Sequence, residues 1–353
     1  MRDFPAYFLM AEITLSSASY KHNFHLISSH IGANVELAAV LKDNAYGHGL
    51  EQISTLAREC GIKSVFVKNY NEALRVSAYF PQITALYGMP EGDFPSHIAF
   101  VINQKEHIEK LPQGTKVELK VNTGMNRNGI EPDELEDFIT LILQRGLELV
   151  GVFSHNGYGD DIDEAFEEAQ TNFAHIKERV KILAQKHHFA LPRFHSLSSS
   201  GAIRVASQGR IEDDLVRIGI ALYGYLDVAF ETPLSTNLRR VAALYADRVS
   251  TRTLNAGARI GYSGCTTLEN PSRISTYDIG YGDGFFRVNE RQRVYTAKGY
   301  QILPRSSMDC FSCLCDEARI CVFDDVRPFA KAFDTISYEI LTHLSPYIKR
   351  TII

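Results

Sequence analysis

The sequence lacks any apolar run near the roughly 18–20 residues that a membrane-spanning helix needs. An apolar stretch at the N-terminus, Phe4–Ala11, is only about eight residues long and meets Glu12 with no small-residue cleavage site behind it. We therefore expect neither a membrane span nor a secretory signal peptide, and we predict a cytoplasmic protein.

An excess of one charge is also missing. The chain has 37 lysines and arginines against 42 aspartates and glutamates, a formal net charge of −5, and no long block of like charges. Nucleic acids and anionic membranes attract dense basic patches. The composition therefore argues against both kinds of partner.

Cysteine is sparse, and its spacing lacks the paired CxxC…CxxC form of many zinc sites. In a cytoplasmic protein the six cysteines should be free thiols. Four of them cluster near the C-terminus with no histidine close by, so we interpret them as buried strand residues and keep a metal cluster as the alternative. The six are Cys60, Cys265, Cys310, Cys313, Cys315 and Cys321.

Two kinds of segment alternate over the first two thirds of the chain. Eight short runs rich in β-branched residues are separated by segments of helical period. Eight strand–helix units within about 230 residues match an α/β (β/α)8 TIM barrel, with a doubly wound open sheet as the alternative. The predicted strands are Val35–Lys42, Ser64–Lys68, Ile83–Gly88, Ile98–Ile102, Lys116–Val121, Leu149–Ser154, Arg193–Ser198 and Asp214–Ile220.

Amphipathic spacing marks the helices between these strands. The clearest case runs from Phe166 to Leu183, with apolar residues alternately three and four positions apart. Similar spacing predicts a leading helix over Tyr20–Ile31 and another over Leu50–Cys60.

The pattern changes after about Asn237, where strand-like runs follow one another with turn signals between them. A chain of 353 residues is too long for one ordinary core. We predict a barrel over residues 12–236 and a mostly β domain over residues 237–353 together with residues 1–11. The runs in the second domain are Val241–Ser250, Arg273–Ile279, Arg293–Ala297 and Ala318–Val322.

Polar residues gather where the predicted barrel strands end. Barrel active sites form at the C-terminal ends of the strands. Each group alone has an ordinary explanation, as a solvated lysine, a structural histidine or a turn. Their convergence on one rim predicts a functional site. These residues are Lys42, Arg127, His155, His195, Ser198–Gly201 and Arg217.

Motifs on this rim resemble those of the alanine racemase family. The run Ala39–Gly49, AVLKDNAYGHG, is similar to the family's cofactor-lysine motif, and Leu119–Arg127 and Val216–Gly224 are similar to further barrel motifs. In the second domain, Ile279–Gly284 and Ser307–Asp309 match as well. The resemblance spans almost the whole chain, with the motifs in the right order.

The resemblance implies a racemase that interconverts L- and D-alanine with pyridoxal 5'-phosphate and supplies D-alanine for peptidoglycan, with serine as a second substrate. Lys42 would hold the cofactor covalently and act as one base, because a desolvated lysine loses its proton more readily. Tyr262 would be the second base on the opposite face, with His155 and Arg217 supporting its anionic form. Two bases suit racemisation, since a single base tends to return the proton to the side it left.

The same resemblance implies the cofactor's other contacts. Arg217, which stays protonated, would donate to the pyridine nitrogen, with His195 behind it. Arg127 would reach the phenolic oxygen and the substrate. Lys120 matches a lysine that some relatives carry as a carbamate, a modification that requires a neutral amine. The phosphate contacts would come from Tyr46, Ser199, Gly219, Ile220 and Tyr347.

Three residues of the second domain match positions that the family supplies from a partner chain. They are Tyr262, Tyr281 and Met308, and they predict an obligate homodimer with shared active sites. Tyr281 and Met308 would bind substrate, with Tyr281 narrowing the entrance. Ordinary aromatic packing in glycine-rich turns is the alternative for the two tyrosines.

The sequence departs from the family pattern at four places. Asp43 stands beside the lysine where alanine is usual, and Ser198 replaces an asparagine. Ser-Gly follows Tyr262 where Gly-Ala is usual. Pro346 falls where a phosphate-binding tyrosine is usual, with Tyr347 next to it. None removes a reacting group, but they bear on the phosphate contacts and on substrate preference.

Two other functions fit part of this pattern. A non-catalytic pyridoxal-phosphate-binding protein would share the Lys42 region but not the domain that carries Tyr262 and Met308. A decarboxylase of the same two-domain plan would place a cysteine–acid pair at the interface, for which Cys310 is the candidate.

Overall fold

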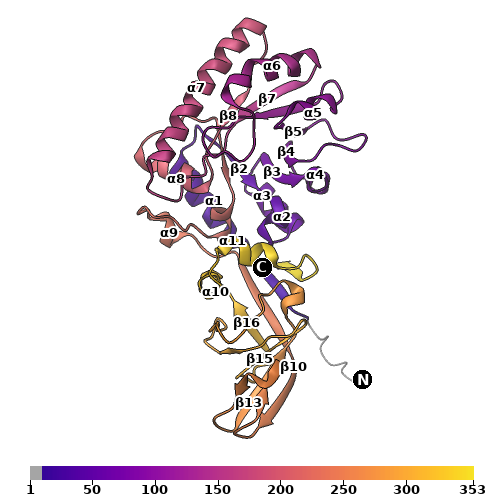
Figure 1. Cartoon of the computed structure of the whole chain (residues 1–353), viewed down its shortest axis with the longest axis vertical. Helices are drawn as coiled ribbons and strands as arrows, with labels where there is room; N and C mark the ends of the chain where they lie inside the picture. Colours follow the sequence, from indigo (N-terminus) through magenta and orange to yellow (C-terminus); the bar gives the residue numbers. More distant parts are fainter. Residues whose placement is uncertain (1–9) are drawn as a thin grey trace. The chain divides into compact units, whose positions relative to one another are not determined.

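The computed structural model describes residues 10–353, which fall into two compact units (Figure 1). The barrel unit comprises residues 18–45 and 53–239. The β unit comprises the described part of residues 1–17 together with residues 46–52 and 240–353. Most of the apolar N-terminal stretch from Phe4 lies outside the described residues.

Eight parallel strands form the barrel unit, in the order β8-β7-β6-β5-β4-β3-β2-β9. The Asp214 amide donates to the Phe194 carbonyl at 2.9 Å and the Arg217 amide to the Leu197 carbonyl at 3.0 Å, which joins the two outermost strands. The predicted barrel is therefore confirmed. The strands are β2 (Glu36–Val40), β3 (Ser64–Asn69), β4 (Gln82–Tyr87), β5 (Ile98–Ile102), β6 (Lys116–Lys120), β7 (Glu148–Phe153), β8 (Arg193–His195) and β9 (Leu215–Ile218).

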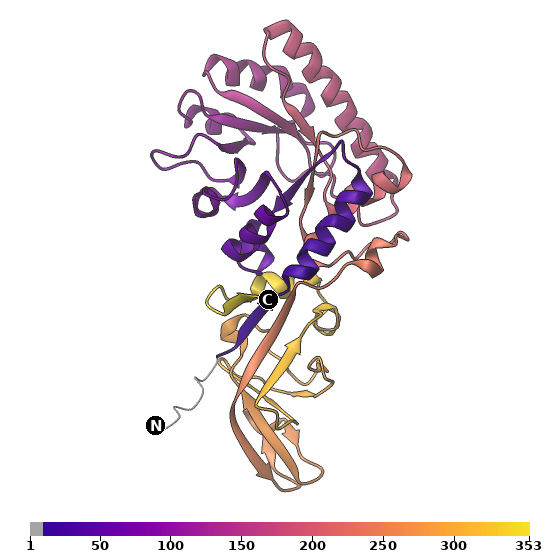
Figure 2. The same ribbon diagram turned by 180° about the vertical axis from the view of Figure 1, so that it is seen from behind.

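The helices lie outside these strands (Figures 1 and 2). The longest, α7 (Glu164–His187), begins where the Asp163 side chain accepts a bond from the Ala165 amide, and it ends at left-handed His188. It buries the residues spaced alternately three and four positions apart, as predicted, namely Phe166, Ala169, Phe173, Ile176, Val180 and Leu183. The others are α1 (Ser17–Ile31), α3 (Leu50–Glu59), α4 (Tyr70–Val76), α5 (Lys105–Glu109), α6 (Leu135–Gln144), α8 (Ser199–Gln208) and α9 (Leu234–Asn237). The segment labelled α2 (Lys42–Tyr46) is a left-handed turn directly after β2.

The β unit is built on a seven-stranded sheet, ordered β14-β15-β13-β10-β1-β17 with β16 paired to β10. A separate pair joins β11 (Arg259–Ile260) to β12 (Thr266–Thr267), and two short helices, α10 (Arg327–Ala332) and α11 (Ser337–His343), complete the unit. The strands of the main sheet are β1 (Glu12–Leu15), β10 (Ala242–Leu254), β13 (Ser272–Tyr277), β14 (Ile302–Leu303), β15 (Phe311–Cys313), β16 (Arg319–Phe323) and β17 (Lys349–Ile352).

One predicted strand of the second domain, Arg293–Ala297, is wrong. The chain turns back on itself there, because the Thr296 amide donates to the Tyr300 carbonyl at 2.9 Å and Gly299 has a φ of 84°. Only an isolated antiparallel bridge remains, between Tyr295 and Gln301. The other three predicted runs coincide with β10, β13 and β16.

A glycine after the predicted cofactor lysine is required by packing within the β unit. A Cβ atom on Gly47 would lie 1.9 Å from the Leu341 carbonyl oxygen, and Gly47 has a φ of 78°. The Gly47 carbonyl accepts hydrogen bonds from the Arg350 guanidinium at 2.8 and 3.1 Å. Packing therefore explains the glycine at this position of the motif, independently of any catalytic role.

The six cysteines are free thiols, as predicted, with Cys313 and Cys315 buried. Across residues 10–353, no cluster of three or more histidine, cysteine or acidic side chains has an arrangement that could hold a metal ion. Within the same range, no helix is long and apolar enough to cross a membrane.

Candidate active site

A left-handed turn follows strand β2 and begins at Lys42. Asp43, Asn44 and Ala45 have φ values of 55°, 55° and 53°, a region that costs a non-glycine residue about 1–2 kcal/mol. The Glu72 carboxylate holds the turn, since it accepts from the Asn44 amide at 2.9 Å and from the Lys68 amide at 2.8 Å. Strained backbone that is held by its surroundings is typical of functional sites.

The Lys42 amine is partly buried at this turn. Burial lowers its pKa, and the neighbouring cations Arg127, Lys68 and Arg217 lower it further, against the opposing charge of Asp43. The Asp43 carboxylate itself pairs with the Lys68 amine at 2.6 Å. A lysine in such surroundings loses its proton more readily and becomes a better nucleophile.

Positive charge dominates the end of the barrel where Lys42 lies. Burial lowers the pKa of Lys120 to about 7, and Arg127, Arg217 and Lys42 add to the shift. Burial together with the same cations holds the pKa of His155 well below its usual value. Four basic side chains, those of Lys42, Lys120, Arg127 and Arg217, lie within electrostatic reach of one another. Such a cluster favours an anionic ligand. A phosphorylated pyridine aldehyde with a phenolate oxygen fits this donor set, and Lys42 would supply the amine that binds its aldehyde.

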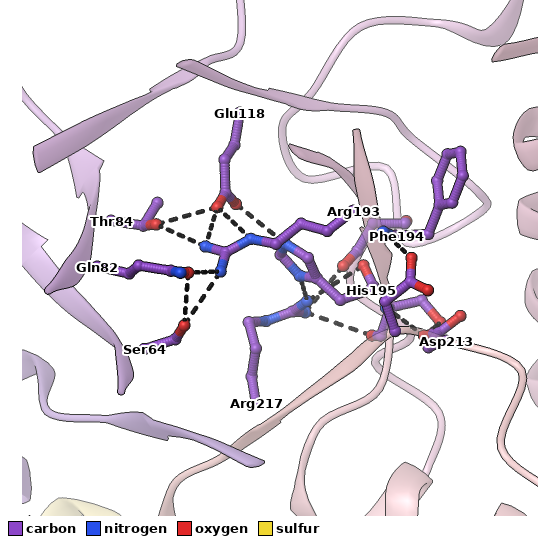
Figure 3. A network of polar contacts seen from close by, with 12 residues as sticks. Ser64, Gln82, Thr84, Glu118, Arg193, Phe194, His195, Asp213 and Arg217 are labelled. Atoms are coloured by element: carbon purple, nitrogen blue, oxygen red, sulfur yellow. Dashed lines mark hydrogen bonds and ion pairs between the residues drawn. The ribbon is translucent and has the colours of Figure 1, made fainter. Parts of the chain in front are cut away.

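Arg217, on strand β9, is held as a planar fork inside the barrel (Figure 3). One terminal nitrogen donates to His195 Nδ1 at 2.5 Å. The other donates to the Ser154 carbonyl at 2.8 Å and lies 3.3 Å from His155 Nδ1. These contacts fix the direction in which the guanidinium presents its remaining N–H groups.

A set of amides and hydroxyls lies where β9 ends and α8 begins. The Ser199 hydroxyl accepts from the Gly219 amide at 3.0 Å, and Ser199 is the first residue of α8. Ile220 begins the next helical turn, and all three residues are buried. Backbone N–H groups at a helix N-terminus favour a phosphate, so the structure brings together three of the predicted phosphate contacts.

Lys120 is buried on strand β6, with 7% of the residue exposed. Its amine donates to the Asn128 side chain and lies 5.9 Å from the centroid of the Phe153 ring. Arg127, one residue before Asn128, is exposed. Lys120, the predicted neighbour of Arg127, is therefore held in place, while Arg127 itself is open to solvent.

Five predicted site residues belong to the β unit: Tyr46, Tyr262, Tyr281, Met308 and Tyr347. Tyr262 and Met308 are 56% and 54% exposed, and Tyr281 is 38% exposed. Tyr347 is 95% exposed, and Pro346 beside it is also exposed, so neither side chain is enclosed within this chain. Tyr46 is buried, and its ring lies 5.8 Å from that of Tyr338.

One segment of the β unit connects the loops of Tyr262, Tyr281 and Met308. A Cβ on Gly261, which precedes Tyr262, would lie 2.9 Å from the Pro304 carbonyl oxygen. Farther along the same segment, the Tyr281 amide donates to the Ser307 carbonyl at 3.2 Å. The segment from Pro304 to Met308 therefore supports both tyrosine turns.

Sequence reasoning missed several polar residues that support this site. Glu72 holds the Lys42 turn, Asn128 accepts from Lys120, and Glu118 and Arg193 lie behind His195. Two-residue periodicity carries a signal for the last pair, because Glu118 shares a strand face with Lys120 and Arg193 shares one with His195. No comparable local signal identifies Glu72.

Comparison with known proteins gives a consistent result over the whole chain. The family model described as alanine racemase, N-terminal domain, matches residues 15–227, and that described as alanine racemase, C-terminal domain, matches residues 241–352. A curated alanine racemase of Campylobacter curvus is 38% identical over 341 residues, covering 97% of this chain and 99% of that protein.

Solved structures of alanine racemases resemble this chain over nearly its whole length. Alanine racemase from Bacillus anthracis, determined with bound L-Ala-P, superposes with a TM-score of 0.84 at 25% identity, covering 99% of this chain and 96% of that one. Alanine racemase from Bartonella henselae, with covalently bound pyridoxal phosphate, gives a TM-score of 0.80 at 25% identity and covers 98% and 100% of the two chains.

Proposed function

The chain belongs to the alanine racemase family, and from this premise we propose that it interconverts L- and D-alanine with pyridoxal 5'-phosphate bound at Lys42. The observation that carries the proposal is the Lys42 amine, which lies in a held left-handed turn among Arg127, Lys120 and Arg217. We further propose that the reaction supplies D-alanine for peptidoglycan in the cytoplasm, with serine as a second substrate.

The cofactor, when bound, supplies an aldehyde that binds amines and a ring that withdraws electrons from the substrate Cα. Lys42 would hold the cofactor through its aldehyde and, with its amine free, would take or return a proton on one face of Cα. Tyr262 of the partner subunit does the same on the opposite face. Racemisation then needs no rotation of the substrate, because each face has its own proton carrier.

Arg217 sets how strongly the ring withdraws electrons. A guanidinium does not lose its proton in proteins, so it donates to the pyridine nitrogen and leaves that nitrogen unprotonated. This limits electron withdrawal and disfavours side reactions that need a fully delocalised charge. Ser199, Gly219 and Ile220 bind the phosphate, with Tyr46 and Tyr347 as further contacts, while Arg127 reaches the phenolic oxygen and the substrate carboxylate. His155 lies beside Arg217, with its Nδ1 atom 3.3 Å from the guanidinium.

The two domains have different roles in the active site. The barrel unit binds the cofactor, and the β unit completes the active site of a second chain. Within one chain, Tyr262 and Met308 are more than half exposed and Tyr281 is exposed over a smaller part of its surface, which suits residues that are covered by a partner.

A direct assay separates this function from its two rivals. The purified protein, loaded with pyridoxal phosphate, is incubated with each enantiomer of alanine and of serine while optical rotation and released CO2 are followed. We expect loss of optical rotation from alanine in both directions and no CO2. Cofactor bound at Lys42 without any racemisation would instead indicate a binding protein, and CO2 release would indicate a decarboxylase.

Subunit complementation tests the shared active site. Lys42→Ala and Tyr262→Phe homodimers should each be nearly inactive towards L-alanine, since every site lacks one base. After subunit exchange, half of the dimers are mixed and each has one intact site, so we expect about a quarter of wild-type activity. The racemisation rate is measured before and after exchange, with exchange followed by two affinity tags. If demonstrated mixed dimers stay inactive, Lys42 and Tyr262 do not act across subunits.

We also propose that Lys120 binds CO2 as a carbamate that orients Arg127. The modification requires a neutral amine, and burial lowers the pKa of Lys120 to about 7, so a large neutral fraction exists near neutral pH. Protein incubated with 13C-bicarbonate should show one slowly exchanging carbamate carbon by NMR that is absent from Lys120→Arg. Lys186→Arg, at an exposed lysine paired with Glu136, should keep the signal. Absence of the signal in the wild type would overturn the carbamate.

A further inference from the structure

We infer that Glu118, anchored by Arg193, is a positioning residue that fixes the tautomer of His195 and thereby the direction in which Arg217 donates. The inference rests on the proposed function, because Arg217 acts there on the cofactor's pyridine nitrogen. It assigns a role to the buried Glu118 and the partly buried Arg193, for which the proposed chemistry has no direct use.

The two oxygens of Glu118 have different partners (Figure 3). Oε2 lies 2.9 Å from His195 Nε2. Oε1 accepts from the Arg193 guanidinium at 2.5 and 3.2 Å and from the Thr84 hydroxyl at 3.0 Å. The side chains of Glu118 and His195 are fully buried. Bulk solvent does not reach either side chain, so the protein contacts dominate where the protons lie.

These contacts permit one tautomer of His195. Burial alone would raise the pKa of Glu118, but Arg193 and His195 hold it well below its usual range, so the carboxylate is ionised and only accepts. His195 Nε2 must therefore carry the hydrogen. Burial lowers the pKa of His195 to about 4, so the ring is neutral and Nδ1 keeps its lone pair.

The free lone pair on Nδ1 is what Arg217 needs. Arg217 has only donors, and its nearest contact in the site is His195 Nδ1 at 2.5 Å. The other tautomer, or an imidazolium, would set one N–H against another at this distance. The ionised groups that act on His195 are Glu118, Arg193 and Arg217, so a single acid between two arginines determines the state of the ring.

Packing around the network keeps it in this arrangement. The His195 ring stacks on Phe153 at 4.8 Å and meets the edge of Phe66 at 5.2 Å, which prevents a ring flip. Strand β7 leaves room for the carboxylate, because a Cβ on Gly151 would lie 2.8 Å from Glu118 Cγ. The barrel interior therefore accommodates Glu118 specifically.

The far end of the network is anchored where the strands begin. Arg193, the first residue of β8, donates from its other terminal nitrogen to Gln82 Oε1 at 2.7 Å and to Ser64 Oγ at 3.1 Å. Gln82 and Ser64 are the first residues of β4 and β3. The contacts thus run through the barrel from its N-terminal rim to Arg217 near the opposite rim. Such supporting contacts keep a reacting group within the narrow geometry that it needs.

The tautomer can be measured directly, without any variant. Protein labelled with 15N-histidine and loaded with cofactor is examined by long-range 15N–1H correlation, and the His195 signals are identified by their loss in His195→Asn. We expect a neutral ring with the hydrogen on Nε2, unchanged between pH 5.5 and 8. A hydrogen on Nδ1, or protonation of the ring in this range, would overturn the inference.

Glu118→Gln tests the consequence for Arg217. An amide of equal size can turn its NH2 group towards Nε2 and favour the wrong tautomer, as removing the charge of the orienting acid does in a serine protease triad. We expect the Nδ1–H tautomer to gain population, a changed absorbance of the bound cofactor, and kcat lower by about 10- to 100-fold with KM for alanine within about threefold. An unchanged tautomer and absorbance would contradict the assignment.

Thr84→Val is the matched control. It removes the hydroxyl's bond to Oε1 and its 3.4 Å contact with the Arg193 guanidinium, but leaves the Arg193–Oε1 bonds and the Oε2–His195 contact in place. Both tautomer and kcat should stay close to wild type, and a loss equal to that of Glu118→Gln would mean that the pocket, and not the charge, is responsible. Failure of the proposed function has a different signature, namely no racemisation by a loaded protein whose His195 carries its hydrogen on Nε2.

Discussion

Replacing Lys42 by alanine is expected to abolish racemisation of both enantiomers of alanine, with a loss of at least about 10⁴-fold in kcat. The residue has two tasks, covalent attachment of the cofactor and proton transfer on one face of Cα, and alanine can do neither. Borohydride reduction followed by peptide mass analysis should locate the wild-type cofactor bond at Lys42 and find none in the variant.

Lys68→Ala is the matched control for this experiment. Its amine lies close to Lys42 and pairs with Asp43 at 2.6 Å, but the Lys68 side chain is 52% exposed, and ion pairs that are open to solvent contribute little. This variant should keep a reducible cofactor bond and most of its activity. If the bond survives in Lys42→Ala, or disappears in Lys68→Ala, the cofactor anchor is misplaced.

Replacing Tyr262 by phenylalanine is expected to slow solvent exchange of the α-hydrogen of L-alanine by about 10²–10⁴-fold, the usual contribution of one acid–base group. Exchange from D-alanine, which depends on Lys42, should remain within about tenfold of wild type. Exchange is the informative measurement, because an equilibrium constant of one forces net racemisation to fall equally in both directions.

The same comparison needs a tyrosine outside the site. Tyr295 belongs to the same unit and is 48% exposed, so Tyr295→Phe should leave exchange from both enantiomers unchanged. Deuterium incorporation from heavy water, followed by NMR for each enantiomer separately, measures both rates. An equal loss of exchange for L- and D-alanine in Tyr262→Phe would contradict the assignment of two bases on opposite faces.

The barrel was predictable because its signals are local. Each buried parallel strand is a short β-branched run, and α7 shows its inward face through the spacing from Phe166 to Leu183. The sheet of the β unit was harder to predict from the sequence. Strand β1 pairs with β17 through Glu12 and Lys349, which lie at opposite ends of the sequence, and nothing in either segment indicates the other.

The site residues at the rim of the barrel could be predicted from the sequence, whereas those in the barrel interior could not. Lys42 and Arg217 follow from strand position and motif, whereas Glu118 and Arg193 are charged residues within strands, where charge is usually exposed. Only the structure shows that they neutralise each other at 2.5 Å and leave one carboxylate oxygen for His195. The left-handed turn at Asp43 and Asn44 likewise depends on Glu72, more than twenty residues away in the sequence.

Racemisation in heavy water shows whether the protein exchanges the α-hydrogen of alanine through its own side chains. The cofactor-loaded protein is given L-alanine in D2O, and the D-alanine that forms is separated and examined for deuterium at Cα. We expect that D-alanine forms and carries solvent deuterium, because its new hydrogen comes from a side chain that exchanges with solvent. No D-alanine from a loaded protein, or D-alanine that keeps its original α-hydrogen throughout, would contradict this expectation.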